Sequence, residues 1–550
     1  MKLILRCGLV FMFSCSLISC DWKKDPLLQG TREQPYAPKS KDTLVLSNSA
    51  EPDTLDPQKV TGLHEIQILD DLFEGLASVN SDGHLVPGVA ESWENQGSKR
   101  WIFHLRSSAK WSNGDPVTAK DFVYAWKRLV NPHTASLYAS YAVDMHILNA
   151  KAIVEGQKDV NQLGVKALDD KTLEVTLEAP LPYLPAMLTH PSVFPLHENS
   201  IKSHGDKWTQ AGNLVSNGAY KLESWLVNNR VTAVKNDYYW DAPHVKIKKV
   251  AYLPITQPTA DAVAFMSGNS DITYNALPPE IYPKLKRLYP NELRLGTQLC
   301  TSYYEMNHGR RPFNDQRVRL ALNLLIDRKN ITDNILKQGQ KPTYTITPAF
   351  TNNFAYMEPE WVKWSMAKRV QKAKELLNAA GFNEQHPLRF ELLYVNRDIN
   401  KTVSLALASE WKRYVNFIQV TMANKEWKGY LQARNAGNFD VVKRNWCGDY
   451  NEPSSFLNVY RSNSSFTHIN YHNPQYDACL DKTLNPSLSD EERKGLYMKC
   501  EKVLMDDAAL LILHTVVAPR LVKSYVKGYK TDDPQNFVHV KDLELLQQAP

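Results

Sequence analysis

The sequence lacks the short motifs by which common enzyme classes are recognised. It has no Walker-type phosphate loop, no G-x-G-x-x-G fingerprint, no G-x-S-x-G nucleophile motif and no H-E-x-x-H zinc motif. The nearest cluster of metal-ligand type, His64-Glu65, has no second histidine, and we interpret it as a solvated surface pair. We therefore expect no enzyme, no cofactor and no metal site.

A strong excess of charge is also missing. The formal net charge is +6 over 550 residues and forms no basic stripe, which argues against a nucleic-acid partner. After the first twenty residues no apolar run is long enough to span a membrane. The apolar and charged fractions, 43% and 23%, are typical of a globular protein. A chain of this length exceeds what one hydrophobic core serves, so we expect at least two lobes.

The N-terminus carries a clear targeting signal. Lys2 and Arg6 precede an apolar run over 9–18, which ends in Leu17-Ile18-Ser19-Cys20. This ending resembles the lipoprotein box, which implies cleavage of a signal peptide over 1–19 and lipidation of Cys20. Residues 20–40 are then the lipid anchor and a polar tether, because several acyl chains hold a protein firmly to a bilayer. An ordinary signal peptide with an incidental cysteine is the alternative.

The four remaining cysteines favour disulfides over metal binding. Their number is even, the chain carries an export signal, and no two have the Cys-x-x-Cys spacing. They are Cys300, Cys447, Cys479 and Cys500.

Strand and helix patterns alternate without an internal repeat. Alternating apolar residues predict strands over 101–106 and 172–178. Cap residues before apolar stripes of period 3.6 predict three helices, which begin after Thr118, after Ser365 and after Ser489. These patterns indicate a mixed α/β protein.

Several longer motifs carry a resemblance to one family. They are 90–128 (AESWENQGSKRWIFHLRSSAKWSNGDPVTAKDFVYAWKR), 71–76 (DLFEGL), 216–220 (SNGAY), 300–307 (CTSYYEMN), 311–319 (RPFNDQRVR) and 446–458 (WCGDYNEPSSFLN). The chain resembles the extracellular solute-binding family that serves peptide and nickel ABC importers, and the last motif resembles its oligopeptide-binding branch.

The resemblance implies an α/β, two-lobed periplasmic-binding-protein clamp of class II, with three domains, mixed β-sheets and a two-strand hinge. Domain I would comprise 41–73, 198–299 and 516–550, domain II 74–197 and domain III 300–515. The implied function is capture of short peptides in the periplasm and delivery to the permease of an ABC importer. The protein would be a monomer that contacts the membrane only through its lipid anchor.

The resemblance also implies a set of binding residues. A receptor for many peptides grips the backbone and the charged ends that all peptides share. Backbone pairing would use Thr61, Gly62 and Leu63 on one side and Asn445 and Cys447 on the other, although ordinary strand and loop would look the same in sequence. Asp449 would hold the ligand's ammonium, with a loop-capping role as the alternative.

Recognition of the ligand's carboxylate departs from the family pattern. Arg434 matches a family cation, while Lys443 stands where the family has an arginine, with Arg444 beside it. Two other family cations align with Leu336 and Asn400. Trp427 and Trp446 are expected to wall side-chain pockets, with core packing as the alternative for Trp427.

Two further points follow from the resemblance. Cys300 and Cys447 match the family's disulfide, whereas Cys479 and Cys500 are equally compatible with a bridge or with buried thiols. The altered cation set leaves open a relative specialised for a murein tripeptide, haem or a metal complex. A secreted hydrolase or an adhesin is a third hypothesis, and no motif in the sequence supports it.

We predict that Cys20 is the lipidation site. Changing Cys20→Ser should release the protein from membrane fractions, because the variant has no thiol to acylate. Fractionation followed by immunoblotting measures this. The assignment would be contradicted if the variant stayed membrane-bound and the wild type were as unprocessed as the variant.

Overall fold

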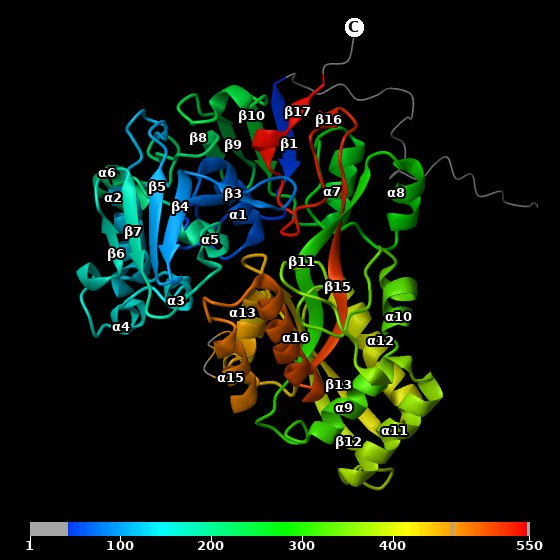
Figure 1. Ribbon diagram of the computed structural model, residues 1–550. Helices are drawn as coiled ribbons and strands as arrows, with labels where there is room; N and C mark the ends of the chain where they lie inside the picture. The colour runs from blue at the N-terminus through cyan, green and yellow to red at the C-terminus, as the bar shows by residue number, and fades with distance from the viewer. Residues whose placement is uncertain (1–41, 463, 465, 467, 547–550) are drawn as a thin grey trace, which may run out of the picture.

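The computed structural model describes residues 42–462, 464, 466 and 468–546. The predicted signal peptide, Cys20 and the tether up to residue 40 lie outside the described residues. The chain forms two lobes, one above the other in Figure 1, and the long strands β11 (Leu293–Met306) and β15 (Leu510–Leu521) run between them.

The first lobe contains two four-stranded sheets and two hairpins. One sheet has the order β1-β10-β9-β8, with β1 (Thr43–Ser47) parallel to β10 (Lys249–Leu253), followed by β9 (Arg230–Lys235) and β8 (Tyr220–Leu226). The other is antiparallel, in the order β4 (Ala90–Gln96), β5 (Arg100–Leu105), β7 (Thr172–Thr176) and β6 (Val165–Ala167). The hairpins are β2 (Ala77–Val79) with β3 (Leu85–Pro87), and β16 (Val526–Lys527) with β17 (Glu544–Leu545).

The second lobe is built on one five-stranded sheet. Its order is β13-β12-β14-β11-β15, where β12 is Leu388–Val395, β13 is Ile418–Lys425 and β14 is Val441–Cys447. Neighbouring residues of the same strand pack into different cores: Val441 belongs to one buried cluster and Val442 to another. The sheet is therefore covered by helices on both faces.

The helices follow the same division. Those of the first lobe are α1 (Leu63–Leu72), α2 (Ala119–Val130), α3 (Ala139–Asp144), α4 (Ala150–Val154), α5 (Leu184–Met187), α6 (Glu198–His204), α7 (Pro258–Met266) and α8 (Tyr282–Leu288). Those of the second are α9 (Gln316–Leu324), α10 (Arg328–Asn330) with the π-helix η8 (Ile331–Leu336), α11 (Met366–Ala379), α12 (Asp398–Tyr414), α13 (Trp427–Asn435), α14 (Ser454–Leu457), α15 (Pro474–Lys482) and α16 (Asp490–Asp506).

The elements predicted from local patterns are confirmed. Both predicted strands are present as β5 and β7. Thr118 and Ser489 form capping boxes at the starts of α2 and α16, and Ser365 caps α11. Gly381 follows α11 at φ +90°, a conformation that glycine adopts at no steric cost.

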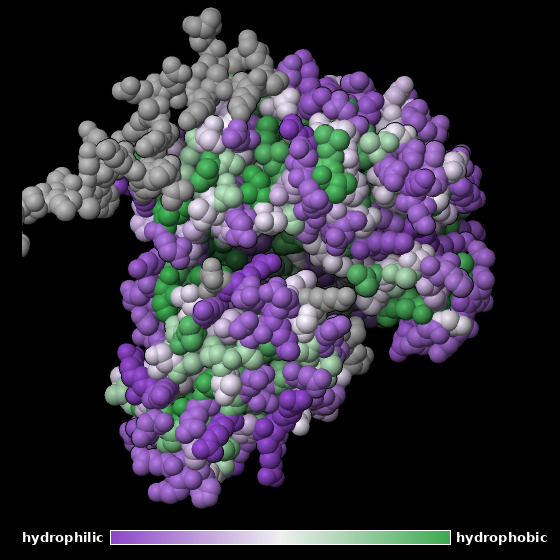
Figure 2. Space-filling model, turned by 180° about the vertical axis from the view of Figure 1, so that it is seen from behind, coloured by the Kyte–Doolittle hydropathy of each residue, from purple (hydrophilic) through white to green (hydrophobic). Residues whose placement is uncertain are grey.

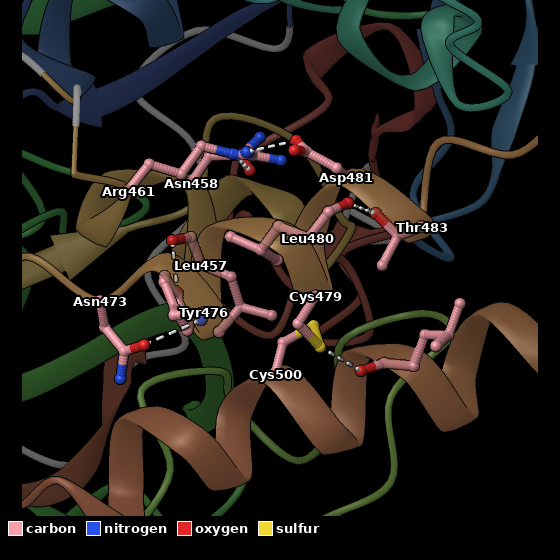
Figure 3. Close-up of a disulfide and its surroundings, with 11 residues drawn as sticks. Leu457, Asn458, Arg461, Asn473, Tyr476, Cys479, Leu480, Asp481, Thr483 and Cys500 are labelled. Carbon is pink, nitrogen blue, oxygen red and sulfur yellow. Dashed lines mark hydrogen bonds and ion pairs between the residues drawn. A yellow bond between two sulfur atoms is a disulfide. The ribbon is translucent and has the colours of Figure 1, made fainter.

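Both cysteine pairs are bridged. Cys300 and Cys447 are direct partners in the pairing of β11 with β14, and a disulfide joins them. Cys479 on α15 and Cys500 on α16 form a second disulfide, which ties the two helices together (Figure 3). Of the two alternatives for Cys479 and Cys500, the structure therefore shows the disulfide and not two buried thiols.

The described part of the chain lacks two features. None of its helices is both long and apolar enough to cross a membrane. Within the same residues, no group of three or more histidine, cysteine, aspartate or glutamate side chains is arranged to hold a metal ion.

We predict that the two disulfides contribute unequally to stability. They close loops with sequence separations of 147 and 21 residues, so the chain-entropy model gives about 5 and about 3 kcal/mol as upper values. Cys300→Ser/Cys447→Ser should therefore lower the free energy of unfolding more than Cys479→Ser/Cys500→Ser. Urea unfolding of the two double variants compares them. Peptide mapping without reduction is the control, and a free Cys300 thiol in the wild type would contradict the first bridge.

Candidate functional site

One edge of strand β14 has no strand partner along part of its length. β14 pairs with β11 from Val441 to Cys447. On its other side β12 pairs only with Val441 and Val442. No other strand of the described residues pairs with the stretch from Asn445 to Cys447 on that side. The edge is therefore open where backbone pairing was expected.

The direction of the backbone groups in β14 follows from two hydrogen bonds. The Gly448 amide donates to the Leu299 carbonyl at 2.8 Å, and the Asn307 amide donates to the Asp440 carbonyl at 2.9 Å. Even-numbered residues of β14 therefore direct their backbone groups towards β11, since these groups alternate in an antiparallel pair. The backbone groups of Asn445 and Cys447 face the open edge.

The opposite segment, Thr61–Leu63, leads into helix α1. The buried carboxylate of Glu65 accepts hydrogen bonds from the Thr61 and Gly62 amides, at 3.3 and 3.0 Å, and from the Asp53 amide at 2.9 Å. Interpreting His64-Glu65 as a solvated surface pair was wrong for Glu65, which is 3% exposed, because its carboxylate satisfies the free amides at the helix start. Pairing by this segment would use its other backbone groups.

Asp449 lies in a tight turn directly after β14. A Cβ at Gly448 would lie 2.9 Å from the side chains of Leu299 and Phe456, so only glycine fits before it. The Asp449 amide donates to the Ser455 hydroxyl at 2.8 Å. The backbone of Asp449 is therefore fixed by the close packing at Gly448 and by the bond to Ser455, and its side chain takes part in neither contact.

The carboxylate of Asp449 has no cationic partner among the described residues. Burial raises its pKa to about 7. Across the interface between the lobes it faces α3, and its charge helps to raise the pKa values of Tyr138, Tyr141 and Asp144, after the larger effect of burial. An ionised carboxylate in this place is costly unless a cation joins it.

The residue after Asp449 docks onto the first lobe. The ring of Tyr450 stacks on Tyr183 at 5.9 Å and meets Tyr141 edge-on at 6.5 Å between centroids. Tyr450 is buried within the hydrophobic core of that lobe. The turn that carries Asp449 is thus fixed by both lobes.

The predicted cation Lys443 is buried and uses all three of its donors inside the protein. Its ammonium donates to the Ser302 hydroxyl, the Arg444 carbonyl and the Asn445 side-chain oxygen at 2.8, 2.9 and 2.7 Å. Burial lowers its pKa to about 7. Neighbouring Arg444 forms a buried ion pair with Glu305. All three donors of the Lys443 ammonium are thus used, and the Arg444 guanidinium also donates to the Phe466 carbonyl at 3.0 Å.

Arg434 differs from both, because no acidic side chain of the described residues lies within ion-pair distance of it. Among the described residues, its guanidinium donates to the Asn435 side chain at 2.9 and 3.2 Å and also has a hydrogen-bond contact with the Tyr430 hydroxyl. Trp427 lies on the same face of α13 as Tyr430 and Arg434. Its ring stacks on Tyr430 at 5.7 Å between centroids, and the residue is 57% exposed. Simple core packing of Trp427 is excluded by this exposure.

The other predicted wall, Trp446, is half-buried. Its indole N–H donates to the Ser455 carbonyl at 2.7 Å, and its ring lies against Phe466 and the Arg444 guanidinium. Of the two positions aligned with family cations, Leu336 is buried in the core of the second lobe, and the Asn400 side chain donates to the Val395 carbonyl.

A cavity lies between the lobes beside these residues. It has about 890 Å³ of space free of protein atoms, part of it open to solvent. Its lining includes Leu63, Cys447 and Asp449 from the predicted set, together with residues 70–71, 189–191 and 537–539. Arg434, Lys443 and the two tryptophans do not line this cavity. Figure 2, seen from behind, shows the surface hollowed between the two halves of the molecule.

Sequence reasoning missed the residues that approach Asp449 from the other lobe. Tyr138, Tyr141 and Asp144 lie about three hundred positions earlier in the chain, and no local pattern connects them with Asp449. The duplicated acid at Asp70-Asp71, where the noted motif 71–76 begins, was the one available signal for the acidic lining of the cavity.

Comparisons with known proteins identify the family of the chain. The model of "Bacterial extracellular solute-binding proteins, family 5 Middle" matches residues 84–468. The periplasmic oligopeptide-binding protein OppA of Salmonella typhimurium is 47% identical over 506 residues, covering 92% of this chain and 93% of the relative.

Two solved structures share the fold. Haemophilus influenzae OppA in complex with RPPGFSPFR has a TM-score of 0.82 at 40% identity, covering 93% of this chain and 100% of that one. The Escherichia coli murein tripeptide binding protein MppA has a TM-score of 0.84 at 38% identity, with coverage of 93% and 100%. The predicted two-lobed α/β clamp is confirmed by this likeness, and the chain belongs to family 5 of the bacterial extracellular solute-binding proteins.

Proposed function

We propose that this protein captures short peptides outside the cytoplasmic membrane and delivers them to an ABC importer. The observation that carries the proposal is the pattern of unused groups around β14. An unpaired carboxylate, Asp449, lies just beyond one end of the open strand edge. An unpaired guanidinium, Arg434, is on α13, whose Tyr430 hydroxyl bonds the Lys443 carbonyl at the other end.

A peptide is the ligand whose chemistry matches all three features. Its backbone can extend the sheet at Asn445 and Cys447, which gives affinity without reading sequence. Its ammonium compensates the Asp449 carboxylate, and its carboxylate can form a bidentate pair with Arg434. Arg434 is thus the principal anchor for the ligand's carboxyl terminus, and Lys443 acts only if its internal hydrogen bonds rearrange.

The relatives support this assignment. The Salmonella typhimurium protein is named as a periplasmic oligopeptide-binding protein, and the Haemophilus influenzae structure holds a peptide. From the sequence we further propose that the protein works in the periplasm as a monomer, anchored through a lipid on Cys20. The domain limits proposed from the sequence remain 74–197 and 300–515 for the second and third domains.

A ligand class narrower than oligopeptides has one argument in its favour. Lys443 and Arg444 are both engaged within the protein, so fewer cations meet the ligand's carboxyl end than a receptor for many lengths requires. Native mass spectrometry of the purified protein separates the two cases. A ladder of co-purified peptides supports the general receptor, and one discrete mass supports a specialised ligand such as a murein tripeptide.

We predict that Asp449 holds the ligand's ammonium. Asp449→Asn should weaken binding of tri-alanine by roughly 2–5 kcal/mol, comparable with other buried charge pairs. N-acetylation of the peptide should weaken wild-type binding by a similar amount and should matter little to the variant. Calorimetry on the four combinations gives the coupling energy.

The exposed acid Asp206 provides the matched control, since Asp206→Asn removes the same charge far from the cleft. The Asp449 variant should be no less stable than wild type, because the carboxylate it loses has no partner in the unliganded protein. If the losses from Asp449→Asn and from acetylation add, the amine is bound elsewhere.

We also predict a bell-shaped dependence of peptide affinity on pH. The pKa of Asp449 is raised to about 7 in the unliganded protein, so below that pH the carboxylate must lose a proton before it can pair. Affinity should then fall by up to tenfold per pH unit. Above about pH 8 the peptide's α-amine loses its charge and affinity falls again. Titrations between pH 5 and 9 measure this, and Asp449→Asn should flatten the acidic limb. An acidic limb that persists in the variant would assign it to another group, such as Asp144.

A further inference from the structure

Among the acids that line the cavity beside Asp449 and have no part in the proposed function, Asp70 is the one without a hydrogen-bond or ion-pair partner among the described residues. Asp70 lines it from α1, on the same helical face as Leu63 and Ile66. Its side chain is partly exposed, and burial raises its pKa to about 8. None of the described residues donates a hydrogen bond to its carboxylate or pairs with it as a cation. Asp70 therefore presents to the cavity an acid without a hydrogen bond or an ion pair, and the nearby charges of His539 and Lys541 offset only part of the effect of burial.

The other charged groups around the cavity already have partners. Asp71 accepts from the Tyr252 hydroxyl at 2.5 Å, Glu74 accepts from Tyr239 and Trp240 at 2.6 Å each, Lys541 lies 3.4 Å from Glu74, and His539 lies 3.1 Å from Asp533. Lys541 is the only lysine or arginine that lines the cavity, and it is engaged by Glu74. Asp70 and Asp449 are the two acids that a ligand in the cavity would meet without a partner.

We propose that Asp70 makes this cavity select a ligand whose first side chain carries a positive charge. The inference rests on the proposed function, because it requires the ligand's ammonium to lie at Asp449. In a peptide the first side chain branches from the carbon next to that ammonium. The cavity is lined by Asp449 and extends from there along α1 to Asp70, so it receives this side chain.

The position of Asp70 on α1 also selects for length. Asp70 lies seven residues after Leu63, about 10 Å further along the helix axis. Helical side chains lean towards the N-terminus, so the Asp70 carboxylate lies nearer to Leu63 than this distance. A long side chain such as that of lysine or arginine reaches it, whereas a cationic side chain of a single carbon does not.

Three tripeptides that differ only in their first residue test the selection. Calorimetry of the full-length wild-type protein compares Lys-Ala-Ala, norleucine-Ala-Ala and 2,3-diaminopropionyl-Ala-Ala. Norleucine has nearly the shape of lysine without its charge, and diaminopropionate has the charge on a shorter stem. The lysine peptide should bind at least tenfold more tightly than the norleucine peptide, and the diaminopropionyl peptide should resemble the latter.

Variants then assign the preference to Asp70. Asp70→Asn should bring the lysine and norleucine peptides within about twofold of each other. Glu91→Gln, which removes the same charge from an exposed position on β4, should keep the wild-type preference. Thermal unfolding shows whether the variants are folded. The comparison of the peptides on the wild-type protein remains valid even if the Asp70→Asn variant does not fold.

The outcomes separate the two proposals. If wild type binds the lysine and norleucine peptides equally, the selection by charge is wrong while peptide capture stands. A preference that survives Asp70→Asn overturns the role of Asp70. If wild type binds none of the three peptides, peptide capture itself fails, and the inference fails with it.

Discussion

A half-buried acid without a cationic partner among the described residues is the constraint on which the rest of the structure depends. Burying the Asp449 carboxylate raises its pKa to about 7, and this cost is recovered only when a ligand supplies the positive charge. The neighbouring turn must hold the acid in place meanwhile. It does so through Gly448, whose position admits no side chain, through the Ser455 hydroxyl and through Tyr450, which is anchored between aromatic rings of the opposite lobe.

The scaffold around this turn restrains the strand that leads to it. Cys447, at the end of β14, is bonded to its direct partner Cys300 on β11. β11 itself runs on into the first lobe beside β15 (Figure 1). One edge of β14 is therefore fixed by hydrogen bonds and a disulfide, while the other is left open near the cleft. A rigid strand with one free edge accepts a peptide backbone without paying for its own ordering.

Affinity and selectivity have separate origins in this arrangement. In the proposed function, the open edge, Asp449 and Arg434 meet groups that every peptide has. The cavity along α1 meets a side chain, and Asp70 gives that cavity its charge. Engagement of Lys443 by Ser302 and Asn445 removes one cation from the carboxyl-terminal side, so selectivity is concentrated near the ligand's amino end.

Local structure and family membership could be predicted from the sequence because both depend on residues close together in the chain. The capping boxes at Thr118 and Ser489 and the alternation over 172–178 fixed helix starts and a strand face in this way. The long motifs around Cys300 and Asp449 indicated the fold and the binding branch. Hydrogen bonds and ion pairs between side chains that are distant in the chain could not be predicted from the sequence. Only the tertiary structure decided that Glu65 is buried at a helix start, that Lys443 has no free donor and that Asp449 and Asp70 share one cavity, because burial and pairing depend on which distant segments meet in space.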